Sequence, residues 1–165
     1  MKLTFISDTH TKHELIPLTD LPGGDIIIHS GDIMNSGYSY GDITDFCEWF
    51  SGLHQYTHKI FIAGNHDRLF ENNPIDATRV VREYPNLAYL QDSLCGIGDL
   101  REKWNWIPDT TDILITHGPP WEHLDATPYG NKRIGCELLR VRVNELKPKI
   151  HVFGHIHSGY GYKFH

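Results

Sequence analysis

The sequence predicts an α/β fold with a largely parallel sheet, and three observations predict it. Short apolar runs rich in β-branched residues alternate along the chain with segments of helical periodicity. Most of these runs are continuous rather than alternating, which is typical of strands covered on both faces. Each run also ends in a short polar cluster. Strands that alternate with helices are the pattern of α/β proteins.

The apolar runs define the predicted strands in chain order. They cover residues 3–6, 26–29, 60–63, 113–115 and 150–153. Three helices are predicted between them. Residues 41–53 carry Ile43, Phe46, Phe50 and Leu53 at spacings of three and four. A shorter helix is predicted over 74–83 with proline in its first turn, and a third over 134–146, which a following proline ends.

Length and composition limit the class of protein. The 165 residues fit one domain, 1–165, with no repeat or linker. The formal net charge of −6 disfavours binding to long nucleic acid. Three scattered cysteines disfavour a disulfide framework and an all-thiolate zinc site. No apolar run could span a membrane, and Asp8 comes too early for a signal peptide, so we expect a cytoplasmic protein.

The polar clusters at the strand ends carry the chemistry. Ligands of open α/β sheets bind outside the carboxyl ends of the strands, so we expect the five clusters to meet at one mouth. Asp8 and His10 are two residues apart, and so are His155 and His157; on regular strands each pair would face one side. The clusters are Ser7-Asp8-Thr9-His10, Ser30-Gly31-Asp32, Gly64-Asn65-His66-Asp67, Thr116-His117-Gly118 and Gly154-His155-Ile156-His157.

The donor types in these clusters predict a metal centre. Carboxylate, imidazole and amide donors suit divalent ions such as zinc, manganese or iron better than an iron–sulfur cluster. Seven candidate ligands are too many for one tetrahedral ion but fit two ions that share a carboxylate. Five of the twelve histidines lie in the clusters, whereas His29 and His151 lie within predicted strands, where packing is the expected role.

The ordered set of clusters resembles the calcineurin-like metallophosphoesterase superfamily. Two stretches of sequence are similar to the small metallophosphoesterase-domain branch of this superfamily, which resembles class III cyclic-nucleotide phosphodiesterases. They are Thr116-His117-Gly118-Pro119-Pro120 and the run from Pro148 to His157. The resemblance implies an αββα sandwich with metal loops at the carboxyl ends of the strands. It covers nearly the whole chain.

The resemblance also implies roles for individual residues. Two divalent ions are implied, with manganese favoured and zinc, iron, nickel or cobalt as alternatives. His66 would be the general acid, and Asp67 would orient it. The implied ligands are Asp8, His10 and His157 for one ion, Asn65, His117 and His155 for the other, and Asp32 as the bridge between them.

The implied activity is that of a hydrolase acting on a phosphodiester or a phosphomonoester. A hydroxide that bridges the metal ions would attack phosphorus, and His66 would protonate the leaving oxygen. A small nucleotide or cyclic nucleotide is the favoured substrate. One alternative is a protein-binding scaffold of the same fold with little activity. A nuclease on long DNA or RNA is disfavoured by the acidic charge.

Three further residues are candidates for substrate binding. Asn35 follows the Gly31-Asp32 pair, Trp121 follows the His117 cluster, and Arg133 could contact phosphate. Trp121 could form a wall of a substrate pocket, and Asn35 could reach the substrate phosphate. For Arg133 a solvated guanidinium is the plainer alternative.

The chain looks like a shortened member of that superfamily. Relatives carry a longer segment where only residues 94–99 stand here, and further strands where few residues follow His157. We therefore expect a reduced second sheet and a more open site. Missing strands would leave edges uncovered, so self-association into a homo-oligomer is also expected.

Overall fold

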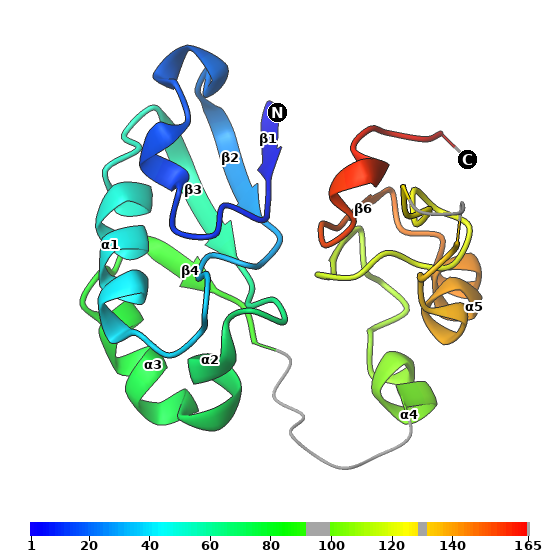
Figure 1. Ribbon diagram of the computed structural model, residues 1–165. Helices are drawn as coiled ribbons and strands as arrows, with labels where there is room; N and C mark the ends of the chain where they lie inside the picture. Colours follow the sequence, from blue (N-terminus) through cyan, green and yellow to red (C-terminus); the bar gives the residue numbers. More distant parts are fainter. Residues whose placement is uncertain (92–99, 129–131, 165) are drawn as a thin grey trace. The chain divides into compact units, whose positions relative to one another are not determined.

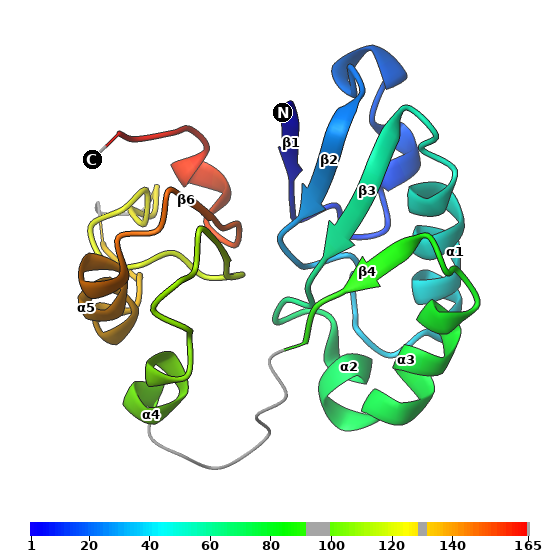
Figure 2. The same ribbon diagram turned by 180° about the vertical axis from the view of Figure 1, so that it is seen from behind.

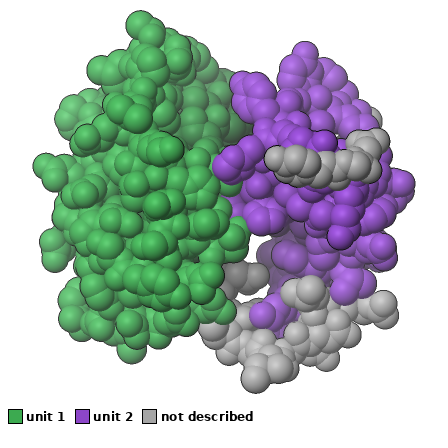
Figure 3. Space-filling view, viewed as in Figure 1, with its two compact units in different colours: residues 1–91 green, residues 92–165 purple. Residues whose placement is uncertain are grey.

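The structure is a computed structural model that describes residues 1–91, 100–128 and 132–164 (Figure 1). The chain forms two compact units, Met1–Gln91 and Asp92–His165 (Figure 3). Each unit combines parallel strands with helices, so the predicted α/β class is confirmed. That the whole chain acts as one domain remains a prediction.

The first unit contains a parallel four-stranded sheet with the strands in chain order. The register places Ile6 opposite His29, and His29 opposite Phe61, so three neighbouring strands end at the same level. The loops that follow them therefore leave the sheet along one edge. The strands are β1 (Leu3–Ile6), β2 (Gly24–His29), β3 (Tyr56–Phe61) and β4 (Leu87–Tyr89).

Helices cover one face of this sheet (Figures 1 and 2). The side chain of Ser39 accepts a hydrogen bond from the Asp42 N–H and so caps the first helix, and Pro74 begins the third. The helices are α1 (Tyr40–Ser51), α2 (Arg68–Asn72) and α3 (Pro74–Arg82), and two 3₁₀ turns, η1 (His13–Leu15) and η2 (Leu18–Asp20), lie between β1 and β2.

An aromatic cluster forms the centre of the core beneath α1. The ring centroid of Phe46 lies 5.1 Å from those of Phe50 and His29 and 5.2 Å from that of Phe61. All four side chains are fully buried. The helical spacing that predicts α1 therefore also identifies the residues of its packed face. His29, predicted to pack, does so, at the last position of β2.

The second unit contains a short parallel pair of strands and a pair of helices in contact with each other. The Arg142 guanidinium links the two helical segments by donating hydrogen bonds to the main-chain carbonyls of Trp104 and Ile107. The elements are α4 (Leu100–Asn105), β5 (Ile113–Ile115), α5 (Glu137–Leu146), β6 (Ile150–Val152) and the 3₁₀ turn η3 (His157–Gly159). Among the described residues this second sheet has two strands, in keeping with the predicted reduction.

The two largest differences between predicted and observed boundaries have local reasons. The helix predicted from residue 134 begins at Glu137, because Cys136 is extended and bridges Pro120. Gly135 also passes so close to Pro120 that an added Cβ would lie 2.6 Å from its carbonyl oxygen. The strand predicted at 60–63 begins earlier, at Tyr56, because pairing with β2 starts there. The short elements α2, β4 and α4 were not predicted.

Two other expectations concern the cysteines and membranes. Cys47 is buried in the core, and its burial raises the pKa of the thiol to about 12. Cys95 and the shortened segment 94–99 lie outside the described residues. Across residues 1–91, 100–128 and 132–164, every helix is too short or too polar to cross a bilayer.

The aromatic core yields a stability prediction. Phe46→Ala should lower the free energy of unfolding by about 3–5 kcal/mol, because it removes a ring that several buried aromatic side chains contact. Urea denaturation of metal-free protein measures the change. Phe5→Ala is the matched control: Phe5 lies on the edge strand β1 and is 44% exposed, so its loss should be much smaller. Equal losses would contradict the assigned core.

Candidate metal centre

Main-chain hydrogen bonds continue beyond the ends of β1 and β2 and connect the loops that follow these strands. The N–H of Ser30 donates to the Ile6 carbonyl at 2.9 Å, and that of Asp8 donates to Gly31 at 2.9 Å. The N–H of His10 then donates to the Asp32 carbonyl at 3.0 Å. The predicted ligands Asp8, His10 and Asp32 are thus positioned by backbone contacts between two loops.

The same ligands have strained backbones. The φ angles of Asp8, His10 and Asp32 are +55°, +45° and +59°, and Thr11 beside them is at +64°. Non-glycine residues rarely adopt this left-handed region, and such strain clusters at functional sites. Asp8 and His10 do not lie on a regular strand, because β1 ends at Ile6 and both residues are in the loop that follows. Their ligand atoms nevertheless lie within 4.8 Å of each other.

His10, Asp32 and His66 form a cluster of possible metal ligands within the first unit. One ligand atom from each lies within 4.8 Å of the others. His10 Nδ1 lies 3.1 Å from the Met34 carbonyl oxygen, which can only accept, so Nδ1 carries the proton. Its Nε2 therefore presents a lone pair, 3.9 Å from Oδ2 of the buried Asp32. An imidazole held through its other nitrogen in this way is typical of metal ligands.

His66 is oriented by the loop that follows β2. Its Nδ1 donates to the Asn35 carbonyl at 2.6 Å, and its main-chain N–H donates to Asp32 Oδ1 at 2.7 Å. Gly37 packs directly beneath it, with φ +81° and space so tight that an added Cβ would lie 2.1 Å from the His66 carbonyl oxygen. In the neutral ring, Nδ1 therefore carries the proton and Nε2 does not. Its ring meets that of His10 edge-on, with centroids 4.7 Å apart.

The Asp67 carboxylate joins two of the loops. Oδ2 accepts from the N–H groups of Asp32 at 2.9 Å, Ile33 at 3.3 Å and Gly64 at 2.7 Å, and Oδ1 accepts from Met34 at 2.8 Å. The side chain is almost fully buried. Burial raises the pKa of Asp67, and these hydrogen bonds oppose the rise.

This arrangement differs from the role that the resemblance implies for Asp67. Its carboxylate contacts main-chain N–H groups of the two loops, whereas the Asn35 carbonyl orients His66. Asp67 also directly precedes α2 without capping it. The sequence could not distinguish the two roles, because both place an aspartate beside His66.

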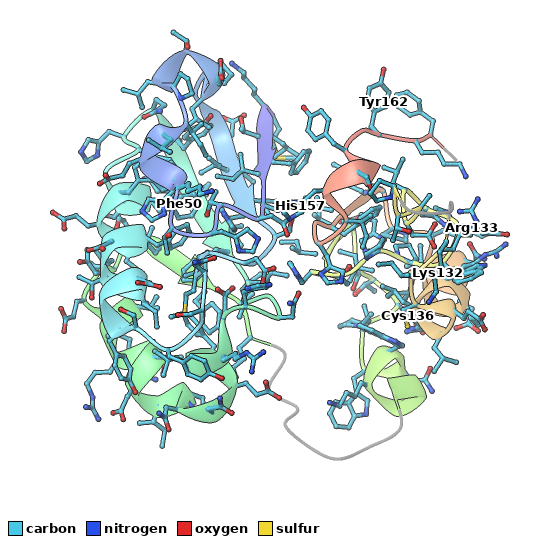
Figure 4. All side chains as sticks on the ribbon, viewed as in Figure 1. Phe50, Lys132, Arg133, Cys136, His157 and Tyr162 are labelled. Atoms are coloured by element: carbon cyan, nitrogen blue, oxygen red, sulfur yellow. The ribbon has the colours of Figure 1, made fainter. Side chains whose placement is uncertain are left out.

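The second unit builds its loops in the same way. The Thr116 N–H donates to the Val152 carbonyl at 3.0 Å, and the Gly154 N–H donates to His117 at 2.9 Å. The rings of His117 and His155 lie 5.1 Å apart. His155 has φ +72°, and His157 (Figure 4) begins η3, so these two also lie beyond their strand rather than on it.

His151 lies on β6 behind these loops. Its Nε2 lies 2.9 Å from Thr116 Oγ1, and its ring packs 5.0 Å from that of Phe153. Burial, with a smaller effect from His123, lowers its pKa to about 4, so the imidazole is neutral at pH 7.

The residues predicted to bind substrate have mixed placements. The side chain of Asn35 is exposed, while its carbonyl holds His66. Arg133 (Figure 4) pairs with the fully buried Asp125 at 2.7 Å. Burial would raise the pKa of Asp125, but hydrogen bonds from Glu122, Gly135 and Arg133 outweigh it and lower the pKa. Arg133 thus has a structural partner, and its side chain is also 42% exposed to solvent.

Sequence reasoning missed a pair beside His66. The Arg68 guanidinium donates to the Tyr38 hydroxyl at 3.0 Å and lies 5.7 Å from the centre of its ring. The two residues flank Gly37 and His66 in the sequence, and the close approach of these loops brings them together. No sequence motif identifies the pair, because the contact arises from the close packing of Gly37 against the main chain of His66 and Arg68.

The residues present fit a divalent metal ion. His10 offers an imidazole nitrogen and Asp32 a carboxylate oxygen, donors that manganese, iron and zinc accept, and the His66 ring lies beside both. Hydrogen bonds to main-chain groups fix the orientation of all three side chains.

Comparison with known proteins identifies relatives. Metallophosphoesterase domain-containing protein 1 of Homo sapiens is 35% identical over 201 aligned residues, which cover 94% of this chain and 60% of that protein. A UPF0046 protein of Caenorhabditis elegans is 34% identical, covering 98% of this chain and 70% of its own. A crystal structure with 15% identity superposes with a TM-score of 0.72 over 93% of this chain and 83% of that chain, which supports the fold.

The relatives are longer than this chain. The chain spans about 60% of the human relative, and the aligned region has 36 more positions than the chain has residues. The relatives therefore carry segments that this chain lacks, as the shortened form predicts. A model described as calcineurin-like phosphoesterase matches residues 1–159. The chain belongs to the calcineurin-like phosphoesterase family.

Proposed function

We propose that this protein is a metal-dependent hydrolase of phosphoric esters. The observation that carries the proposal is the cluster of His10, Asp32 and His66, in which two imidazoles are fixed through Nδ1 beside a buried carboxylate. Membership of the calcineurin-like phosphoesterase family supports it. The strained loops after β1 and β2 support it further, because such strain clusters at functional sites.

The proposed cofactor is a pair of divalent ions, with manganese favoured. When bound, they would supply an activated water and stabilise charge on the phosphoryl oxygens. The assignment of ligands rests on the sequence motifs and the family. The proposed ligands are Asp8, His10, Asp32, Asn65, His117, His155 and His157.

His66 is proposed to protonate the leaving oxygen. The Asn35 carbonyl keeps the proton on Nδ1 in the neutral ring, so Nε2 is the atom that takes up a proton and delivers it. The contact from the His66 N–H to Asp32 fixes the main chain from which the ring projects. General acid catalysis of this kind assists most when the leaving group is a poor one.

A small phosphodiester such as a nucleotide or cyclic nucleotide is the proposed substrate. The net charge of −6 disfavours a long polyanion, which needs a basic surface. A small ester bound through metal ions does not require one.

The metal requirement is tested with a bis-aryl phosphate as substrate. Added manganese should stimulate hydrolysis and a chelator should abolish it, since the ions activate the water. An Asp32→Asn preparation made in parallel controls for contaminating phosphatases and should be inactive. Metal analysis of the wild-type protein before chelation should find two ions per chain. A wild-type protein that binds no metal would favour the scaffold alternative.

The proton-transfer role of His66 predicts a substrate-dependent loss. His66→Ala should reduce kcat by about 10²–10⁴-fold for an alkyl ester and by less for an aryl ester, whose leaving group needs no proton. Metal content should stay at the wild-type level, and His58→Ala, an exposed histidine on β3, should be unaffected. Loss of metal in His66→Ala would show that His66 is a ligand instead.

The contacts of Asp67 predict a different signature. Asp67→Asn replaces a four-fold acceptor with a group that has only one acceptor oxygen, so the loops should loosen. We expect a loss of about 2–3 kcal/mol in the free energy of unfolding and at least about tenfold weaker manganese binding. Calorimetric titration measures the binding, with the exposed Asp76→Asn as control. A fall in kcat with unchanged metal affinity would instead support the orienting role.

A further inference from the structure

A buried threonine–histidine contact lies behind the first metal loop. Thr9 Oγ1 is 3.0 Å from His29 Nε2, and both side chains are buried. His29 Nδ1 accepts from the Gly31 N–H at 3.3 Å, so in the neutral ring Nε2 carries the proton and donates it to Thr9. One imidazole therefore joins the loop after β1 to the loop after β2.

The second unit repeats this contact with different residues. Thr116 Oγ1 donates to the Gly118 carbonyl at 2.8 Å, so it must accept from His151 Nε2, which lies 2.9 Å away. His151 stands on β6, and Thr116 follows the neighbouring parallel strand β5. The first contact has the same form: His29 stands on β2, and Thr9 follows the neighbouring parallel strand β1.

We propose that His29 and His151 are positioning residues, each of which holds the metal-binding loop of the adjacent strand through a hydrogen bond from Nε2–H to a threonine hydroxyl. The inference rests on the proposed function, because it concerns how the ligands of that site are placed. We call the two contacts the Thr9–His29 brace and the Thr116–His151 brace.

The position of each threonine gives the brace its effect. Thr9 lies between Asp8 and His10, and both of these residues and the next one, Thr11, have positive φ angles. A loop in this conformation relaxes unless contacts hold it. Thr116 directly precedes His117, and its second hydrogen bond, to the Gly118 carbonyl, spans that ligand.

Packing alone does not account for these histidines. A phenylalanine or leucine could fill the volume beside Phe46, where His29 lies. A buried imidazole must instead satisfy its polar atoms, and both His29 nitrogens do so on the two loops. The family's metal ligands lie within one residue of Thr9 and Thr116, so the braces act where a small displacement alters the ligand geometry.

The test compares manganese binding by the 165-residue chain and its threonine variants. Thr9→Val and Thr116→Val keep the shape but remove the hydroxyl, and each should raise the dissociation constant for manganese by about 10–100-fold. Thr9→Ser and Thr116→Ser keep the hydroxyl and should recover most of the affinity. Thr57→Val, an exposed strand position on β3, is the matched control and should bind as the wild type does.

Two measurements on metal-free protein separate positioning from general destabilisation. Long-range ¹H–¹⁵N spectra of the wild type should show both imidazoles as Nε2–H tautomers. Amide exchange at Asp8 and His10 should accelerate on the order of tenfold in Thr9→Val, whereas exchange in the α1 core should change little.

The outcomes are distinguishable. Unchanged manganese affinity in both valine variants would overturn the proposal, as would serine variants as weak as the valine ones or an Nδ1–H tautomer for either ring. A wild-type protein that binds no manganese would overturn the proposed function and the braces together. If one valine variant fails to fold, the other unit's brace and the wild-type tautomers still decide.

Discussion

The candidate centre of the first unit depends on a single buried carboxylate. Asp67 binds four main-chain N–H groups, three from residues 32–34 and one from Gly64, and so ties the loop after β2 to the loop after β3. Hydrogen bonds to charged groups contribute about 1.5–3 kcal/mol each. Asp32, whose carboxylate faces His10 and anchors His66, stands on one of these loops. Without Asp67 the main-chain N–H groups would lose their acceptor, and the predicted ligands would lose their support.

This support offsets the cost of the loop conformations. Left-handed backbone costs roughly 1–2 kcal/mol for a residue other than glycine, and Asp8, His10 and Asp32 all adopt it. Main-chain bonds between the loops, the Asp67 carboxylate and the aromatic core beneath them supply the opposing stabilisation. These hydrogen bonds between loops can form because β1, β2 and β3 end at the same level, so that each loop leaves the sheet beside the next.

Much of this architecture could be predicted from the sequence, and the rest could not for physical reasons. The periodic residues of α1 and the β-branched runs of β1 and β5 identify their elements, because burial selects them. The motifs name the residues of the cluster. They cannot reveal that Asn35 acts through its carbonyl or that Asp67 binds backbone, since main-chain contacts leave no trace in side-chain identity. The start of β3 at Tyr56 could not be predicted either, because it depends on pairing with the neighbouring strand β2.

The bond between His66 and the Asn35 carbonyl also bears on how the site could diversify. Because position 35 holds the imidazole through its main chain, its own exposed side chain is not committed to that task. The side chain at position 35 can therefore vary from one homologue to another without disturbing the orientation of His66. A library randomised at this codon would vary the surface beside a fixed imidazole, a freedom that the tightly packed Gly37 two positions later does not have.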